Sequence, residues 1–310
     1  MKDFSIVIPA KNEHVHLGTC LNHLAAQNAS FEVIVVDNGS TDDTVAIIES
    51  FQGKLDIKVI VLEQVSISAL RNAGAQIADG KIIAFIDADC VAPANWLETA
   101  KELAQPHSLW GAHYKDPEDA TWVTRVWTRH QAKETEGAVE FIPAGCMFIH
   151  REDFLGLRFD ETVTTSEDVD ICRRARLGRM QVISDKRLAV VHNGSPRDLS
   201  AFYRKNRWHG EAVVRNFIHA LPSTRYAGIV GLSAYTLLLT WLLIVSVPVS
   251  VYLKSPWLSI AIALALVGPS ALIALCKTIN RPTDFVLLTT LYLTYFGARA
   301  ASITRSYRSW

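Results

Sequence analysis

KIIAFIDADC, residues 81–90, is the segment from which the fold of this sequence is best predicted. Its apolar run, Ile82–Ile86, is typical of a short strand buried on both faces. The run ends in Asp87-Ala88-Asp89, and ligands of open α/β sheets bind at the carboxyl ends of strands. Two carboxylates there suit a hard divalent cation, which in turn suits a diphosphate. Because Asp-x-Asp also occurs in ordinary turns, the alternative is a loop without a ligand.

Three similar strands precede this one, each followed by a helical pattern. The predicted strands cover 4–10, 31–36 and 57–62, and helices are expected at 66–78 and at 93–103, the last begun by proline. Successive strand–helix units predict an α/β fold with a largely parallel sheet wrapped by helices. The first turn, Ala10-Lys11-Asn12-Glu13, lacks the GxGxxG of dinucleotide-binding domains, which argues against an NAD enzyme.

Two polar positions in these units have both a structural and a functional interpretation. Asp37 ends the second strand, where it is either a cap or turn residue or a ligand contact. Arg71 lies near the start of the helix at 66–78, where a helix N-terminus and an arginine together favour an anion. The alternative for Arg71 is a surface arginine paired with a carboxylate.

The segments in this order and spacing resemble a family 2 glycosyltransferase of the GT-A fold. The resemblance covers roughly residues 4–195 and is carried by SIVIPAKNE, VVDNGSTDDT, SALRNAGAQIADG, IIAFIDADC, GCMFIHREDF, RFDE, SEDVDICRRARLG and VVHNGS. It implies a Rossmann-like GT-A catalytic domain and a sugar nucleotide as donor, with UDP favoured.

The resemblance also implies roles for particular residues. Asp87-Ala88-Asp89 matches the DxD motif, in which Asp89 is the more direct ligand of Mg²⁺ or Mn²⁺. His192, which closes a strand expected at 187–192, is either a further metal or phosphate contact or a structural histidine. The remaining donor-binding positions are Pro9, Ala10, Asn12, Glu13, Asp37 and Asn38, which match base and ribose contacts, and Arg71.

Glu167 and Asp168 open a second acidic centre, before a helical pattern rich in arginine. Acidic residues are favoured at a helix N-terminus without any function. The pair also fits the family's ED motif, in which the aspartate is the general base. Inverting sugar transfer needs such a group to take a proton from the acceptor hydroxyl. Asp168 is therefore the expected base, with Glu167 beside it.

Two segments have a weaker pattern. Residues 111–140, with the preceding Trp110, include His113, Tyr114, Trp122, Trp127 and His130, which either face an acceptor or belong to a core or membrane surface. A strand is expected after them, at 141–149. Residues 198–217 read as a basic amphipathic helix at a membrane interface. Within it, Arg204-Lys205-Asn206-Arg207-Trp208 resembles the QxxRW motif of processive synthases without the glutamine, which puts processive polymerisation in doubt.

The C-terminal third of the chain is apolar and basic. Residues 226–253 and 255–276 carry no charged side chain and are long enough to span a bilayer. Residues 285–304 form a third apolar segment, interfacial or spanning. After Arg225 the sequence has six basic residues against Asp284, a net charge of +5, which leaves −5 for residues 1–225. Because the excess of basic residues lies in the apolar part, it indicates how that part is oriented in a membrane. No basic surface for binding nucleic acid is expected in the rest of the chain.

These observations predict a GT-A domain at 1–197, an interfacial helix or linker at 198–225 and a membrane domain at 226–310. Met1 leads into the first strand, so no signal peptide is expected, and the five scattered cysteines fit a reducing cytosol. The expected protein is an inverting, metal-dependent glycosyltransferase on the cytoplasmic face of the inner membrane. Its acceptor is a lipid-linked sugar or a polyprenyl phosphate, in cell-envelope or extracellular polysaccharide synthesis. The alternatives are an inactive GT-A membrane scaffold and a sugar nucleotidyltransferase. A nucleotidyltransferase would need a glycine-rich, basic loop after the first strand, which this sequence lacks.

Overall fold

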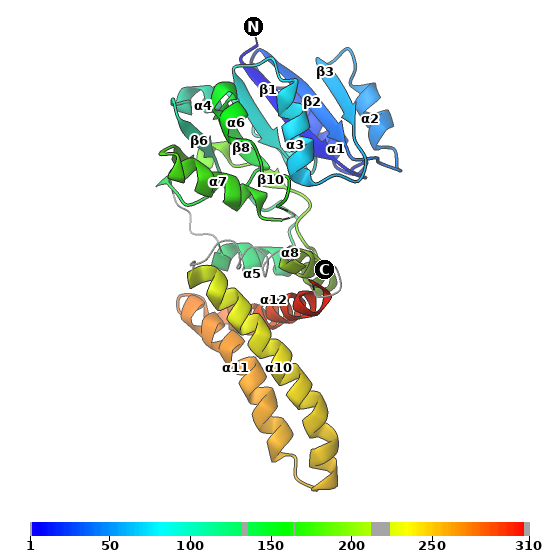
Figure 1. Ribbon diagram of the computed structural model, residues 1–310, viewed down its shortest axis with the longest axis vertical. Coiled ribbons are helices and arrows are strands. Elements are labelled where there is room, and N and C mark those ends of the chain that lie inside the picture. Colours follow the sequence, from blue (N-terminus) through cyan, green and yellow to red (C-terminus); the bar gives the residue numbers. More distant parts are fainter. Residues whose placement is uncertain (1, 132–135, 164, 212–223, 307–310) are drawn as a thin grey trace. The chain divides into compact units, whose positions relative to one another are not determined.

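The computed structural model describes residues 2–131, 136–163, 165–211 and 224–306 (Figure 1). The chain forms two compact units. The first, called here the sheet unit, combines Met1–Glu118 with Lys133–Gly194. The second, the helical unit, combines Asp119–Ala132 with Ser195–Trp310. The chain therefore leaves the sheet unit at residue 119, returns to it, and leaves again at residue 195.

The sheet unit contains a mixed, mostly parallel sheet in the order β3-β2-β1-β4-β8-β6-β9-β7. β1, β2, β3 and β4 are parallel, β8 is antiparallel to β4 and β6, and β7 is antiparallel to β9. The strands are β1 (Phe4–Ala10), β2 (Phe31–Asp37), β3 (Ile57–Val61), β4 (Ile82–Ile86), β6 (Ser108–Gly111), β7 (Gly137–Ala138), β8 (Cys146–His150) and β9 (Gln181–Ser184). A separate short ribbon pairs β5 (Cys90–Val91) with β10 (Val191–His192).

Helices cover both faces of the sheet. Every residue of β1 and β4 is buried, as expected for strands between two helical layers. One apolar cluster packs α1 (Leu17–Ala25), α2 (Thr44–Ser50) and α4 (Trp96–Leu103) on one face. The other packs α3 (Ile67–Gln76), α6 (Arg151–Leu157) and α7 (Glu167–Leu177) on the opposite face. The predicted α/β architecture is confirmed.

Three predicted elements have different bounds. α4 begins at Trp96 instead of residue 93, because Pro93 lies in a turn whose carbonyl accepts the Trp96 N–H at 3.1 Å. The strand expected at 141–149 is β8, which starts at Cys146 after a turn at Pro143. The strand expected at 187–192 is reduced to β10, because a 3-10 turn occupies Lys186–Leu188.

The helical unit contains α5 (Trp122–Gln131), α8 (Leu199–Glu211), α10 (Thr224–Tyr252), α11 (Trp257–Lys277) and α12 (Phe285–Ser306). Among the described residues, Gly228–Tyr252, Trp257–Lys277 and Pro282–Ile303 are long and apolar enough to cross a membrane. The third differs from the others, since 44% of its most apolar window is buried against 11% in each of the other two. Residues 212–217 of the predicted amphipathic helix lie outside the described residues.

α12 is more buried because α5 and α8 pack against it. Trp127 of α5 contacts the rings of Phe202, Tyr292 and Tyr295, with centroids 4.8–5.5 Å apart. Asp284, just before α12, accepts from Arg129 at 2.8 Å and pairs with His130 at 2.9 Å. Trp127 and His130 therefore contribute to the core of the helical unit, one of the two interpretations that the sequence left open.

Candidate active site

The loops that follow β1 and β2 are joined by their side chains. The Asn12 N–H donates to Ser40 Oγ at 2.9 Å, and the Thr41 N–H donates to Asn12 Oδ1 at 2.8 Å. Asp37 accepts from the Ser40 N–H at 2.9 Å, so it shapes this loop and does not cap α2, which begins at Thr44. The two loops form one polar surface at the carboxyl ends of the strands.

Asn38 and Ser66 hold the start of α3 next to this surface. The Asn38 side chain accepts from the Val65 N–H at 3.2 Å and donates to the Val65 carbonyl at 3.1 Å, while its own N–H donates to the Ala10 carbonyl at 2.8 Å. Ser66, expected to be the first residue of this helix, instead caps it by accepting from the Ala69 N–H with its side chain. The helix that carries Arg71 is thereby anchored to the ends of β1 and β2.

Asp87, at the end of β4, is held from three sides. Arg71 donates to its Oδ1 at 2.7 Å, and the Tyr114 hydroxyl donates to its Oδ2 at 3.1 Å. A Cβ at Gly145 would lie 2.2 Å from Asp87 Oδ2 and 2.4 Å from the Tyr114 oxygen. A glycine at 145 is therefore required for this close approach.

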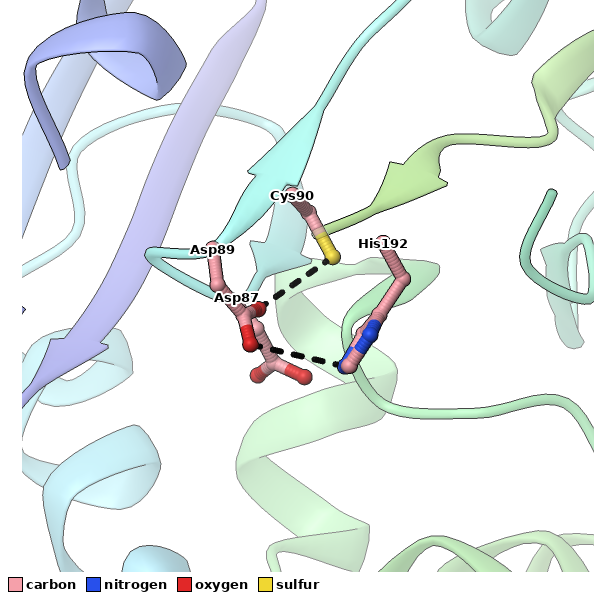
Figure 2. A group of neighbouring side chains, drawn as sticks. All are labelled: Asp87, Asp89, Cys90 and His192. Carbon is pink, nitrogen blue, oxygen red and sulfur yellow. Dashed lines mark hydrogen bonds and ion pairs between the residues drawn. The ribbon is translucent and has the colours of Figure 1, made fainter. Parts of the chain in front are cut away.

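Asp89 lies two residues further on, opposite His192 (Figure 2). The antiparallel pairing of β5 with β10 places His192 beside Cys90, and His192 Nε2 is 3.5 Å from Asp89 Oδ2. The Cys90 thiol points to Asp89 Oδ1 at 3.7 Å. A Cβ at Gly194 would lie 1.9 Å from Asp89 Oδ2, so the backbone closely surrounds this carboxylate.

Arg71 joins the two acidic centres of the sequence. Its guanidinium donates to Asp87 at 2.7 Å and to Glu167 Oε1 at 2.6 Å, and the residue is only 3% exposed. The DxD and ED segments are thus brought together through one buried cation. Arg71 is paired with carboxylates, as one of its two interpretations expects, but it is buried instead of lying on the surface, and its contact with an anionic ligand stays a prediction.

Asp168 begins α7 next to Glu167 and is in an unusual electrostatic position. Burial and the charge of Glu167 raise the pKa of Asp168 to about 7, although the Val169 N–H and Arg71 act in the opposite direction. The charge of Asp87 also raises this pKa, so Asp168 and the DxD segment are within electrostatic reach of each other. A carboxylate that titrates near neutral pH can accept a proton in a reaction.

Glu13 connects the polar surface of β1 and β2 to the DxD segment. Burial raises the pKa of Glu13 to about 7, and the charges of Asp89 and Asp87 add to this effect. Such repulsion among Glu13, Asp87 and Asp89 is relieved by a cation. The carboxylates therefore gather negative charge at one place on the sheet edge.

The donors present fit a divalent cation. Among the described residues, Asp87, Asp89, Cys90 and His192 each offer a ligand atom, and these atoms lie within 4.8 Å of one another (Figure 2). Two carboxylates and an imidazole suit Mn²⁺ or Mg²⁺, since both ions accept oxygen ligands and Mn²⁺ also accepts imidazole.

Comparison with known proteins identifies the family. The sequence profile of Glycosyl transferase family 2 matches residues 5–157. The amylovoran biosynthesis glycosyltransferase AmsB of Erwinia amylovora is 30% identical over 216 residues, which cover 62% of this chain and 71% of AmsB. The chain therefore belongs to glycosyltransferase family 2.

Other similar proteins match over less of the sequence or in fold alone. The poly(ribitol-phosphate) β-N-acetylglucosaminyltransferase TarS of Staphylococcus aureus is 35% identical over 112 residues, which are 34% of this chain and 20% of TarS. The solved TarS 1–349 complex with UDP-GlcNAc has a TM-score of 0.50 at 19% identity, covering 99% of this chain and 92% of that one. The mannosyltransferase PcManGT from Pyrobaculum calidifontis, solved with GDP-Man and Mn²⁺, has a TM-score of 0.65 at 16% identity, covering 100% and 90%. These likenesses confirm the GT-A-like fold.

The structure brings most of the predicted positions to the same edge of the sheet, in two linked groups. One group is the polar surface at β1 and β2; the other surrounds Arg71. Sequence reasoning missed Cys90, Gly145 and Gly194 as parts of the second group, and it named Tyr114 only as one of several aromatic residues that either face an acceptor or belong to a core or membrane surface. The adjacency of Cys90 to DxD was the signal available; the others are recognisable only in space. The predicted positions are Pro9, Ala10, Asn12, Glu13, Asp37 and Asn38 in the first group and Arg71, Asp87, Ala88, Asp89, Glu167, Asp168 and His192 in the second.

Proposed function

We propose that this protein is a membrane-anchored, metal-dependent, inverting glycosyltransferase. In this proposal a sugar passes from a nucleoside diphosphate donor, with UDP favoured, to a membrane-proximal acceptor. The observation that carries it is the ion-pair bridge through Arg71, which brings the carboxylates of DxD next to those of the ED segment. A donor-binding group and a candidate base at one sheet edge are what a direct displacement requires.

The donor half of the site uses the polar surface and the DxD carboxylates. Asn12, Asp37 and Asn38 present fixed polar groups to the base and ribose, on the loops after β1 and β2. A cation held by Asp89, Asp87 and His192 would supply charge neutralisation to the donor diphosphate. Arg71 orients the Asp87 carboxylate, since its guanidinium is already engaged at 2.7 Å.

Asp168 is proposed to act on the acceptor. Its carboxylate removes the proton of the acceptor hydroxyl while that oxygen forms a bond to the anomeric carbon, and the bond from that carbon to the diphosphate oxygen breaks. Attack opposite the leaving group inverts the anomeric configuration. A pKa of about 7 leaves a large fraction of Asp168 deprotonated at neutral pH. Glu167, engaged by Arg71, positions the start of α7.

The helical unit supports an acceptor at a membrane. Its helices are long and apolar enough to cross a bilayer, and α8 carries Arg204, Arg207 and an exposed Trp208. A lipid-linked sugar or a polyprenyl phosphate fits such a surface, with the sheet unit on the cytoplasmic side, where sugar nucleotides are made. AmsB, by its name, serves amylovoran biosynthesis, which favours a role in extracellular or cell-envelope polysaccharide.

The proposal is tested with the full chain purified in detergent. A panel of UDP-, GDP- and TDP-sugars is screened by thermal shift with and without Mn²⁺, because a ligand at about 100 times its Kd stabilises by about 2.7 kcal/mol. One donor should stabilise the protein in a Mn²⁺-dependent way and be consumed when a lipid-linked sugar or a polyprenyl phosphate is added.

The variant Asp89→Asn should lose both responses, whereas Asp185→Asn should keep them, since Asp185 pairs with Arg187 and is not one of the candidate cation ligands. If no sugar nucleotide in the panel stabilises or reacts, the proposal is wrong.

A further inference from the structure

The candidate cation ligands include one sulfur donor, Cys90, besides the oxygens of Asp87 and Asp89 and the nitrogen of His192. Cys90 follows Asp89 directly, is 0% exposed, and its thiol faces the Asp89 carboxylate and the imidazole of His192 (Figure 2). Its sulfur belongs to the same set of ligand atoms, within 4.8 Å of one another. Neither the donor contacts nor the base of the proposed reaction needs a thiol here.

We propose that Cys90 makes this site a high-affinity site for thiophilic divalent ions, of which Zn²⁺ is the representative, and that such an ion excludes the nucleotide donor. The inference rests on the metal site of the proposed function and adds to it a second class of ligand. Mg²⁺ or Mn²⁺ uses the carboxylates and His192, whereas a thiophilic ion also binds the sulfur of Cys90.

The distances suit a tetrahedral ion. Zn–S bonds of about 2.3 Å and Zn–N or Zn–O bonds of about 2.0–2.2 Å place tetrahedral donors about 3.3–3.7 Å apart. The structure has 3.5 Å between His192 Nε2 and Asp89 Oδ2 and 3.7 Å between Cys90 Sγ and Asp89 Oδ1. These two distances involve different oxygens of Asp89, so an ion bound through Cys90, Asp89 and His192 requires the Asp89 carboxylate to rotate and the ligand atoms, which lie within 4.8 Å of one another, to move closer together.

The choice between ions follows from the hardness of the donors. Mg²⁺ and Mn²⁺ prefer oxygen and gain little from sulfur, so they leave Cys90 as a neutral thiol. Zn²⁺ binds thiolate strongly, and its binding here releases one proton from Cys90 to solvent. The same metal site therefore holds hard and thiophilic ions with different ligand sets.

Occupancy by Zn²⁺ should prevent donor binding. A zinc ion with four protein ligands has no open coordination position, as in structural zinc sites. Asp87 is the fourth donor within reach, already fixed by Arg71 and Tyr114. The position that a donor phosphate would take at Mg²⁺ or Mn²⁺ is then closed.

Cobalt absorption tests the ligand directly. The full chain carrying Cys276→Ser, which removes the exposed thiol of α11, is titrated with Co²⁺ and followed by its thiolate-to-cobalt charge-transfer band. The band should appear, should be absent in Cys90→Ser, and should persist in Cys146→Ala, a thiol buried in the same apolar cluster. Removing even an outer-shell partner costs about 10–100-fold in metal affinity, so Zn²⁺ affinity should fall at least about tenfold in Cys90→Ser.

Competition and X-ray absorption complete the test. Zn²⁺ should displace Mn²⁺ and abolish the donor-induced thermal shift in the Cys276→Ser protein. Zinc-edge X-ray absorption of that protein, which needs no change at Cys90, should contain a sulfur shell near about 2.3 Å. A band unaffected by Cys90→Ser, or a zinc ion bound without sulfur, would overturn the inference. Neither result would contradict the proposed function, which is tested separately by Mn²⁺-dependent sugar transfer in the unmodified chain.

Discussion

Replacing Arg71 by methionine should destabilise the sheet unit and uncouple its two acidic segments. Arg71 is buried and pairs with Asp87 and Glu167, whose side chains are 26% and 13% exposed. Removing one partner of a buried ion pair typically costs about 3–5 kcal/mol, because an uncompensated charge remains buried. Since both carboxylates retain some contact with water, and Asp87 keeps the Tyr114 hydroxyl, we expect about 3 kcal/mol.

The cost should depend on pH. In the wild type, burial would raise the pKa of Asp87, but the charges of Arg71 and His192 outweigh burial and lower it. Asp87 therefore contributes stability that is present above its unfolded pKa of about 3.9 and is lost as the pH falls through its lower folded pKa. Without Arg71, burial is uncompensated and the pKa rises, so the destabilisation is full at neutral pH and decreases as acid protonates the carboxylates.

Cysteine labelling in the full chain measures the loss of stability caused by Arg71→Met. Cys20, Cys90, Cys146 and Cys172 are buried and all belong to the sheet unit, so their labelling in urea, in a Cys276→Ser background, reports the unfolding of that unit. The matched control is Arg187→Met, because Arg187 also pairs with two carboxylates but is half exposed and should cost at most about 1 kcal/mol. Equal costs for the two variants at neutral pH, or a cost for Arg71→Met that does not decrease as the pH is lowered from neutral to below about 4, would refute the reasoning.

Further predictions concern the same edge of the sheet. Because burial and Glu167 raise the pKa of Asp168 to about 7, kcat should rise with pH through about 7 and level off above it; a flat profile between pH 5.5 and 8.5 would contradict the role of Asp168. Gly194→Ala should weaken Mn²⁺ binding, measured by electron paramagnetic resonance, at least about tenfold, since its Cβ would collide with Asp89; Gly156→Ala, with open space around it, should not. Tyr114→Phe keeps the ring against His192 but removes the hydroxyl from Asp87, and should lower Mn²⁺ affinity about tenfold without a change in fold; equal affinity would show that the hydroxyl does not position Asp87.

The sheet could be predicted from the sequence because its strands are local signals. β4 is a continuous apolar run and β1 is interrupted only by Ser5, and the polar residues that follow these strands mark the functional edge. The predicted starts of α4 and β8 were too early, because Pro93 and Pro143 each lie in a turn that precedes the element. Periodicity alone does not separate such a turn from the first residues of a helix or strand.

The helical unit was harder to foresee because its contacts join distant residues. Arg129 and Asp284 are 155 residues apart, and nothing near Arg129 in the sequence indicates a partner before α12. The aromatic residues of α5 therefore have two interpretations in the sequence, and the contacts of Trp127 with Tyr292 and Tyr295 support the core interpretation.

The motif residues of the site could be predicted, but the residues that hold them in place could not. Asp87, Asp89, Glu167 and Asp168 belong to recognisable motifs, but the bridge through Arg71 depends on how α3 packs on the sheet. Gly145 acts through close approach, which leaves no signature in an isolated sequence.

The replacement Asp168→Asn tests the central claim most directly. It keeps the size of the side chain and removes the carboxylate, so transfer to an acceptor hydroxyl should fall about 10²–10⁴-fold. Because only the base is lost, the Kd of the donor with Mn²⁺ should stay within about threefold of the wild type. When the transfer rate and the donor Kd of this variant are measured together, the predicted result is a loss of transfer with donor binding intact. Unchanged turnover with a hydroxyl acceptor would contradict the account, because Asp168 would then not be the base.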